Sequence, residues 1–267
     1  MIKLNLGRNC LKLIIRTYGI KEIFIPYYSC KTTWHACREE NCKINFYHID
    51  KDFLPICEFP NNAYILYINY FGMFTRNCKI LAHRYKNLIT DNTQAFYAPY
   101  YGIASFNSLR KFFPVQNGAY LEIEKEPTLD FQTDNLELKN VQMQKDYKLF
   151  RQNELTLNNE SIKLISPKVE MQMGDIDFGQ DKKQRLEIFK EYEKLFDRYN
   201  LIKLPALNSN IPYCYPLCTT NEKIIKKLEN LTILRLWDQI PKSFPEYEFL
   251  YNVAALPLNK FIYKILM

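Results

Sequence analysis

The sequence is poor in glycine and lacks several patterns that would point directly to a function. Only seven of its 267 residues are glycine, so each is expected where the backbone conformation requires it. No run of five or more like charges occurs, although the formal net charge is +7. Nucleic-acid-binding surfaces normally show clustered basic residues. The sequence therefore does not predict a nucleic-acid partner, and the excess charge indicates either a solvated surface or a preference for anionic small molecules.

Signals for secretion, membrane insertion and metal binding are also missing. The N-terminal stretch "MIKLNLGRNCLKLII" has no small-residue cleavage site, and no 18-residue apolar stretch occurs, so neither a signal peptide nor a membrane span is expected. The eight cysteines form no CxxC pair, and no histidine lies near them in a ligand-like pattern. Reduced, mostly buried thiols in a cytoplasmic protein without a metal are the expected state.

The first half of the chain alternates between apolar segments and amphipathic ones. Strands are expected at 21–28, 43–50, 63–72, 88–91, 101–106 and 118–124, and helices at 7–19, 31–42 and 76–87. Thr32 or Thr33 is the expected N-cap of the second helix. This alternation predicts an α/β fold with a mainly parallel sheet. Ligands bind beyond the C-terminal strand ends of such sheets, where Asp91 and Gly72 lie.

The second half is harder to interpret. Residues 122–180 are polar and weakly periodic, as in a loop-rich excursion or a linker. Residues 181–200 form an amphipathic pattern, with Leu186, Phe189, Tyr192 and Phe196 on one helical face. Short segments after residue 200 indicate a small α+β unit. The expected organisation is a large α/β domain at 1–180 and a small C-terminal domain at 181–267.

Asp91 and Lys111 suggest one particular chemistry. A lysine amine forms a Schiff base with an aldehyde, and pyridoxal 5′-phosphate needs both that lysine and a carboxylate on its ring nitrogen. The start of the first helix supplies backbone N–H groups for a phosphate, and Ser105 and Ser108 supply hydroxyls. Each residue also has an ordinary explanation. A strand-end aspartate often caps a helix or forms a turn, and a lysine in a loop is usually exposed.

An ordered set of motifs resembles the DegT/DnrJ/EryC1 family, the sugar aminotransferases among the fold-type I pyridoxal-phosphate enzymes. The motifs are "LGRNCLKLII", "IFIPYYSCKTTWHA", "INFYHID", "YILYINYFG", "LITDNTQAF" and "SFNSLRKFFPVQNGAYL", followed by "IPYCYPLC", "LRLWDQIP" and "AALPLN". The resemblance covers residues 4–121 well, 185–260 moderately and 122–184 poorly. It implies a mixed sheet of seven strands, with a reduced C-terminal domain.

The resemblance also implies roles for individual residues. Lys111 would bind the cofactor covalently and then move protons as general acid and base. The implied cofactor-binding set is Asp91 on the ring nitrogen, Gln94 on the ring or its 3-hydroxyl, Ser105 and Ser108 on the phosphate, and Gly7, Arg8 and Asn9 near the phosphate. An amino donor, typically glutamate, and a keto-sugar attached to a nucleotide would be the substrates, in surface polysaccharide biosynthesis. The active site would lie at the boundary of a homodimer.

Several positions depart from the family pattern. The chain is shorter than is typical, and Arg8 stands where the family has a serine or threonine. Cys30 aligns with the aromatic residue that stacks on the cofactor ring, for which Tyr27, Tyr28 or Trp34 are possible substitutes. Arg110 competes with Lys111 for the aligned lysine position, but only lysine forms the Schiff base. Two alternatives therefore stay open: a catalytically degenerate binding or regulatory protein, and another pyridoxal-phosphate reaction such as dehydration.

Overall fold

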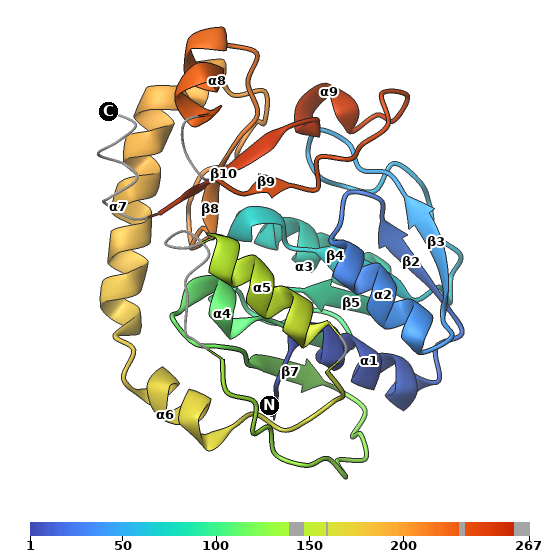
Figure 1. Ribbon diagram of the computed structural model, residues 1–267. Helices are drawn as coiled ribbons and strands as arrows, with labels where there is room; N and C mark the ends of the chain where they lie inside the picture. Colours follow the sequence, from blue (N-terminus) through green and yellow to red (C-terminus); the bar gives the residue numbers. More distant parts are fainter. Residues whose placement is uncertain (139–146, 159, 230–232, 259–267) are drawn as a thin grey trace.

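The computed structural model describes residues 1–138, 147–158, 160–229 and 233–258 (Figure 1). The strands of its main sheet are β1 (Ile2–Leu4), β2 (Glu22–Pro26), β3 (Lys43–Tyr47), β4 (Ile65–Ile68), β5 (Leu88–Asp91), β6 (Ala104–Phe106) and β7 (Ala119–Ile123). They lie in the order β1-β7-β6-β5-β4-β2-β3. The pairs from β3 to β6 are parallel, whereas β7 is antiparallel to both β6 and β1. This is the mixed seven-stranded sheet that the resemblance implies.

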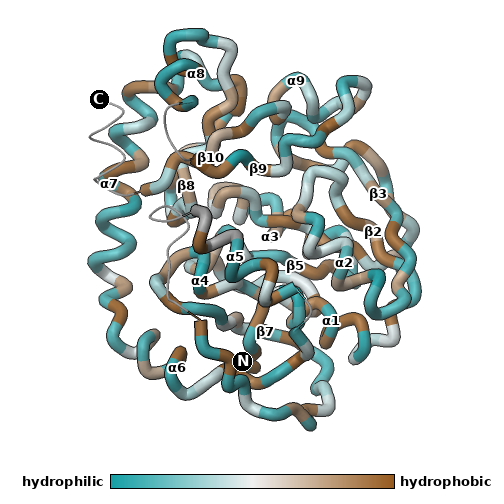
Figure 2. Tube along the Cα trace, viewed as in Figure 1, coloured by the Kyte–Doolittle hydropathy of each residue, from teal (hydrophilic) through white to brown (hydrophobic). Residues whose placement is uncertain are grey.

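Helices cover both faces of this sheet. The helices described in residues 1–200 are α1 (Gly7–Tyr18), α2 (Lys31–Glu39), α3 (Thr75–Arg84), α4 (Leu109–Phe112), α5 (Tyr147–Leu157), α6 (Pro167–Gly174) and α7 (Phe178–Phe196), with 3₁₀ turns at Tyr70–Gly72 and Asp197–Tyr199. The apolar residues of α1 and α2 belong to one buried cluster, and those of α3 and α7 belong to another. Hydrophobic residues follow the strands, and hydrophilic ones gather on outer helices and loops (Figure 2).

The alternation of side chains along β4 and β5 divides these two clusters. Ile65 and Tyr67 of β4 pack into the cluster with α3, whereas Leu66 points to the cluster with α1. Leu88 and Ile89 of β5 divide in the same way. Successive side chains of a strand point to opposite faces, and central parallel strands are buried on both. The continuous apolar runs of the sequence therefore place these strands in the middle of the sheet.

A second sheet lies beyond the first. Its strands are β8 (Cys214–Leu217), β9 (Arg235–Leu236) and β10 (Val253–Pro257), in the order β8-β10-β9, accompanied by α8 (Glu222–Glu229) and α9 (Tyr247–Leu250). The long helix α7 packs against β8, where Phe189, Tyr192 and Tyr215 form one ring cluster (Figure 1). These strands form the small α+β unit expected near the C-terminus; a boundary at residue 180 stays a prediction.

Several local expectations differ from the structure. Cys30 is the N-cap of α2, and neither Thr32 nor Thr33 has that position. Lys111 lies on the short helix α4 instead of in a loop. The weakly periodic segment 122–180 contains α5, α6 and the start of α7. Ser166 caps α6, and Pro167 fits its first turn. Part of the expected C-terminal segment, 259–267, lies outside the described residues.

In the described part of the chain, no helix is both long and apolar enough to cross a membrane. Among the same residues, no three His, Cys, Asp or Glu side chains gather as a metal-binding group.

Candidate active site

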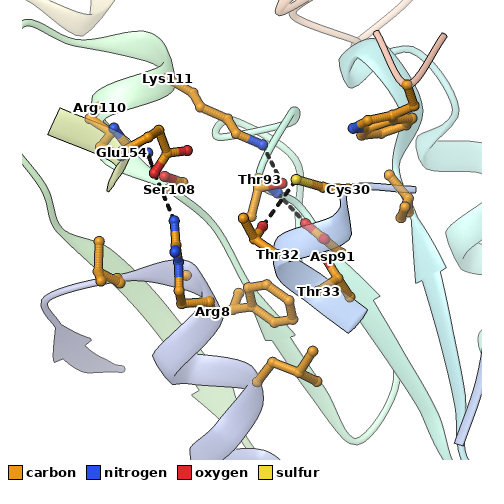
Figure 3. A pocket seen from close by; sticks show the side chains of 16 residues that line it. Arg8, Cys30, Thr32, Thr33, Asp91, Thr93, Ser108, Arg110, Lys111 and Glu154 are labelled. Atoms are coloured by element: carbon orange, nitrogen blue, oxygen red, sulfur yellow. Dashed lines mark hydrogen bonds and ion pairs between the residues drawn. The ribbon is translucent and has the colours of Figure 1, made fainter. Parts of the chain in front are cut away.

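A pocket opens at the C-terminal edge of the central strands (Figure 3). Its volume is about 640 Å³, part of which is open to solvent. Sixteen residues line it: Leu6, Gly7, Arg8, Leu11, Cys30, Thr32, Thr33, Ile68, Asp91, Thr93, Phe106, Ser108, Arg110, Lys111, Glu154 and Trp237. They come from the N-termini of α1 and α2, the ends of β4 to β6, α4, α5 and the segment after β9. Parallel strands bring their ends, and the helix N-termini that follow them, to one edge.

Asp91 ends β5 and lies at the bottom of this pocket, with 4% of its surface exposed. Its Oδ1 accepts a hydrogen bond from the backbone N–H of Thr93 at 2.8 Å. Burial raises the pKa of the Asp91 carboxyl, and the positive charge of Lys111 and the hydrogen bonds from Thr93 offset part of that rise. The result is a desolvated carboxylate with acceptor capacity facing the pocket, which suits a protonated ring nitrogen.

Lys111 reaches into the same pocket from α4 (Figure 3). Its Nζ donates a hydrogen bond to the Thr93 hydroxyl at 2.9 Å. Thr93 therefore contacts both functional groups, Asp91 through its N–H and Lys111 through its hydroxyl. The neighbouring Arg110 turns instead toward Glu154. Of the two basic residues that compete in sequence, Lys111 is the one directed toward the Asp91 end of the pocket.

Backbone contacts hold the short helix α4 in place. The N–H of Leu109 donates to the carbonyl of Gly118, and the N–H of Gly118 donates to Asn5. At the other end of α4, the guanidinium of Arg185 donates to the carbonyl of Phe112 at 3.0 Å, and its centre lies 4.6 Å from the Phe112 ring. Four residues alone cannot form a stable helix, so these tertiary contacts determine where Lys111 points.

The other end of the pocket is cationic. Arg8, in the first turn of α1, and Arg110, on α4, both contact the Glu154 carboxylate of α5. Gly7 lies beside them, with space so limited that an added Cβ would lie 3.0 Å from the Asn107 carbonyl. Ser108 lines the same region and is 8% exposed. Backbone N–H groups at a helix start and two guanidinium groups together form a setting for an anion.

Three predicted binding residues lie outside the set that lines the pocket. Gln94 is 2% exposed, and its Oε1 accepts the backbone N–H of Phe71 at 2.8 Å. The Ser105 hydroxyl donates to the Thr90 carbonyl and accepts from Asn92. Asn9 is buried, and its amide donates to Asn5 and to the carbonyl of Ser161. In this structure all three hold neighbouring segments together, and their roles toward a cofactor stay predictions.

The structure also adds pocket residues that the sequence analysis did not select. Thr93, Glu154 and Trp237 line the pocket, and Arg110 had been considered only as a competitor of Lys111. The position of Thr93, two residues after a strand-end aspartate, is the usual one for a backbone donor to such a side chain. Glu154 gave no signal because it lies in the weakly periodic segment.

The residues considered for ring stacking differ in their relation to the pocket, and a stacking role stays a prediction. Cys30 lines the pocket, whereas Tyr28 is buried against Tyr70, and the Trp34 indole donates to Ser29. Trp237 is the aromatic ring that reaches the pocket from the second sheet, and it packs edge-on to Tyr28 with centroids 4.8 Å apart. Trp237 lies in the motif "LRLWDQIP", but that motif did not indicate a place in the pocket.

No family model and no curated protein matches this sequence. Solved structures do match in fold. A DegT DnrJ EryC1 StrS aminotransferase from Brucella abortus has a TM-score of 0.65 at 15% identity, over 99% of this chain and 83% of that one. DesV from S. venezuelae, solved with a ketimine intermediate, has a TM-score of 0.67 at 14% identity, over 99% and 82%.

A third structure is NtdA from Bacillus subtilis with bound cofactor PMP, at a TM-score of 0.63 and 15% identity, over 100% of this chain and 71% of that one. These likenesses, together with the strand order, confirm the predicted fold class: the chain has the fold of the fold-type I pyridoxal-phosphate transferases.

Proposed function

We propose that this protein is a pyridoxal-phosphate-dependent aminotransferase that acts on a sugar or a related small carbonyl compound. The observation that carries the proposal is the shared environment of Asp91 and Lys111. A buried carboxylate and a lysine amine from separate elements enter one pocket and are linked through Thr93. The fold shared with solved aminotransferases supports this proposal.

The residues present fit the proposed cofactor. When bound, pyridoxal phosphate supplies an aldehyde for covalent attachment and a ring that accepts electrons. Lys111 offers the amine and is placed to accept and return a proton; Asp91 offers the carboxylate that keeps a ring nitrogen protonated. Gly7, Arg8 and Ser108 line the cationic end, where they suit a phosphate. Trp237 and Cys30 also line the pocket.

For the substrates, we propose glutamate as amino donor and a nucleotide-linked keto-sugar as acceptor, in surface polysaccharide biosynthesis in the cytoplasm. Both substrates are anionic, in keeping with the net charge of +7 and with the arginines of the pocket. We further propose a homodimer, because active sites of this fold usually lie at a subunit boundary. Sedimentation equilibrium at micromolar concentration tests the dimer, and a monomeric mass of 32.0 kDa would contradict it.

A degenerate relative that binds without catalysis is the second candidate. The observation in its favour is Glu154, whose negative charge lies among the arginines of the cationic end. A third possibility keeps the cofactor but changes the reaction, for example to a dehydration. The products of a half-reaction with glutamate separate these candidates, because only an aminotransferase releases 2-oxoglutarate and retains the amine.

The first experiment compares the wild type with Lys111→Ala after incubation with pyridoxal phosphate and desalting. We expect a visible absorption band that borohydride abolishes in the wild type and no such band in the variant. Lys168→Ala, which removes an exposed lysine of α6, is the matched control and should retain the band. A wild type without the band would refute the proposed function.

A further inference from the structure

Glu154 occupies the cationic end of the pocket (Figure 3). Its Oε1 lies 2.7 Å from the Nη2 of Arg8 and 2.5 Å from the Nη2 of Arg110. A single carboxylate oxygen therefore receives charged hydrogen bonds from two guanidinium groups. Arg8 also donates through Nη1 to the Oδ1 of Asn158, one turn further along the chain. Both contacts come from the α5 segment, which lies in front of the main sheet in the view of Figure 1.

The two arginines are nearly as buried as core residues. Only 9% of the Arg8 side chain and 8% of the Arg110 side chain are exposed. Two guanidinium groups that approach one point repel each other, and burial without an anion would cost several kcal/mol. Burial lowers the pKa of the Arg110 guanidinium, and the charge of Glu154 partly restores it. These residues therefore require an anion between them.

The charge state of Glu154 agrees with that requirement. Burial acts to raise the pKa of its carboxyl, but attraction to Arg110, Arg8 and Lys111 outweighs burial, and the pKa is lowered. Glu154 is therefore ionised at neutral pH. Its side chain is 22% exposed, more than twice the exposure of either arginine. A carboxylate at the open side of an arginine pair can leave toward solvent, whereas the arginines stay in place.

We propose that Glu154 is the resident counter-anion of a phosphate subsite formed by Arg8, Arg110 and Ser108, and that an incoming phosphate group displaces it. A phosphate monoester carries up to two negative charges and three terminal oxygens, and guanidinium groups bind such oxygens in pairs. Both arginines approach the same oxygen of Glu154, Oε1. A phosphate would offer the two guanidinium groups several terminal oxygens in place of this shared one.

This inference rests on the proposed function in one respect: the phosphate is assigned to the cofactor. A nucleotide-linked substrate also carries phosphate groups, so the shared chemistry is a phosphate held by two arginines. Pyridoxal 5′-phosphate and uridine diphosphate, each used as a competitor of inorganic phosphate, distinguish the two sources. Competition by pyridoxal 5′-phosphate assigns the subsite to the cofactor, and competition by the nucleotide alone assigns it to the substrate.

Titration calorimetry with inorganic phosphate is the test, in a buffer free of other oxyanions. We expect Glu154→Gln to bind phosphate roughly tenfold more tightly than the wild type, because the competing internal charge is removed. Glu170→Gln is the matched control. It removes one carboxylate from an exposed pair with Lys3 and gives the same net charge. An unchanged or weaker affinity in Glu154→Gln would overturn the proposal, since Glu154 would then only hold the arginines in position.

A second measurement covers the case in which the Gln variant is poorly folded. We expect Glu154→Gln to melt at a lower temperature than the wild type without phosphate and to gain more from added phosphate, because a ligand stabilises the state that it binds. Glu154→Asp keeps the charge on a shorter side chain and should lie between the two. An equal gain from phosphate in all three proteins would contradict the exchange.

Phosphate affinity tests the subsite independently of the cofactor band, which tests the proposed function. Lys111→Ala removes the amine but leaves the arginines, so tighter phosphate binding in Lys111→Ala/Glu154→Gln than in Lys111→Ala supports the subsite even if the wild type shows no cofactor band. A cofactor band in the wild type without any change in phosphate affinity on mutation of Glu154 would refute the subsite alone.

Discussion

Lys111 donates a hydrogen bond to the hydroxyl of Thr93, whose backbone N–H in turn donates to Asp91. Thr93, two residues after the end of β5, thus contacts both the amine and the carboxylate on which the proposed chemistry depends. The side chain of Thr93 determines the position of the amine, and its backbone determines the position of the carboxylate. The two functions can be separated by mutation because only one of them uses the hydroxyl.

Thr93→Val removes the hydroxyl acceptor and keeps the shape of the side chain. A hydrogen bond to a charged group contributes on the order of 2 kcal/mol, so we expect the Lys111 amine to lose its fixed orientation. The rate at which the borohydride-sensitive band appears with pyridoxal phosphate should fall by roughly tenfold. Stopped-flow absorbance measures this rate. Thr93→Ser, which keeps the hydroxyl, should react like the wild type, and equal rates for the Val and Ser variants would exclude a role for this bond.

Asp91→Asn tests the carboxylate, and its effect on stability depends on pH. The pKa of Asp91 is raised in the folded protein, chiefly by burial. The folded state therefore holds its proton more tightly than the unfolded chain, and stability is lost as pH rises from about 4, the ordinary carboxyl range, through the raised value. The variant has no such loss. We expect a higher urea midpoint than the wild type at pH 7 and a smaller difference near pH 3.

Asp175→Asn is the control for that comparison, because Asp175 is exposed at the end of α6. It should leave the urea midpoint unchanged at both values of pH. If Asp91→Asn lowers stability at pH 7, the attraction between Asp91 and Lys111 is stronger than the cost of burial.

Arg185 is a positioning residue for the Lys111 helix. It pairs with Asp181 at 2.7 Å and donates to the carbonyls of Phe112 and Tyr213. Arg185→Met leaves these carbonyls without their donor, and removal of one partner of a mostly buried pair costs about 3 kcal/mol. We expect that loss in urea unfolding, with slower formation of the cofactor band in protein that is still folded. Arg185→Lys should restore stability in part, whereas Lys183→Met, on the exposed face of the same helix, should change neither quantity.

The sequence predicted the sheet well and the site only in part, for identifiable physical reasons. Continuous apolar runs such as Leu88–Asp91 determine the central strands, because burial on both faces leaves few alternatives. Asp91 and Lys111 could be selected because each lies next to a recognisable element. Glu154 could not, because it reaches the pocket by long-range packing from α5, and the motif "LRLWDQIP" contained Trp237 without indicating that it reaches the pocket. Gln94 was selected from its motif, but the motif does not reveal that its side-chain oxygen accepts a hydrogen bond from the backbone N–H of Phe71.

Gly118 offers a test of how closely the fold controls the position of Lys111. Its φ is 104°, a conformation that side chains with a Cβ rarely adopt, and an added Cβ would lie 2.7 Å from the Cδ1 of Leu109, the first residue of α4. We expect Gly118→Ala to cost about 1 to 3 kcal/mol in urea unfolding and to displace α4. Displacement should reduce the cofactor band in folded protein, because Lys111 moves away from Thr93. Gly174→Ala is the matched control, since nothing lies within 4 Å of its added Cβ, and it should change stability by less than about 0.5 kcal/mol. A Gly118→Ala protein with normal stability and a normal band would show that α4 tolerates movement and that Lys111 does not depend on this contact.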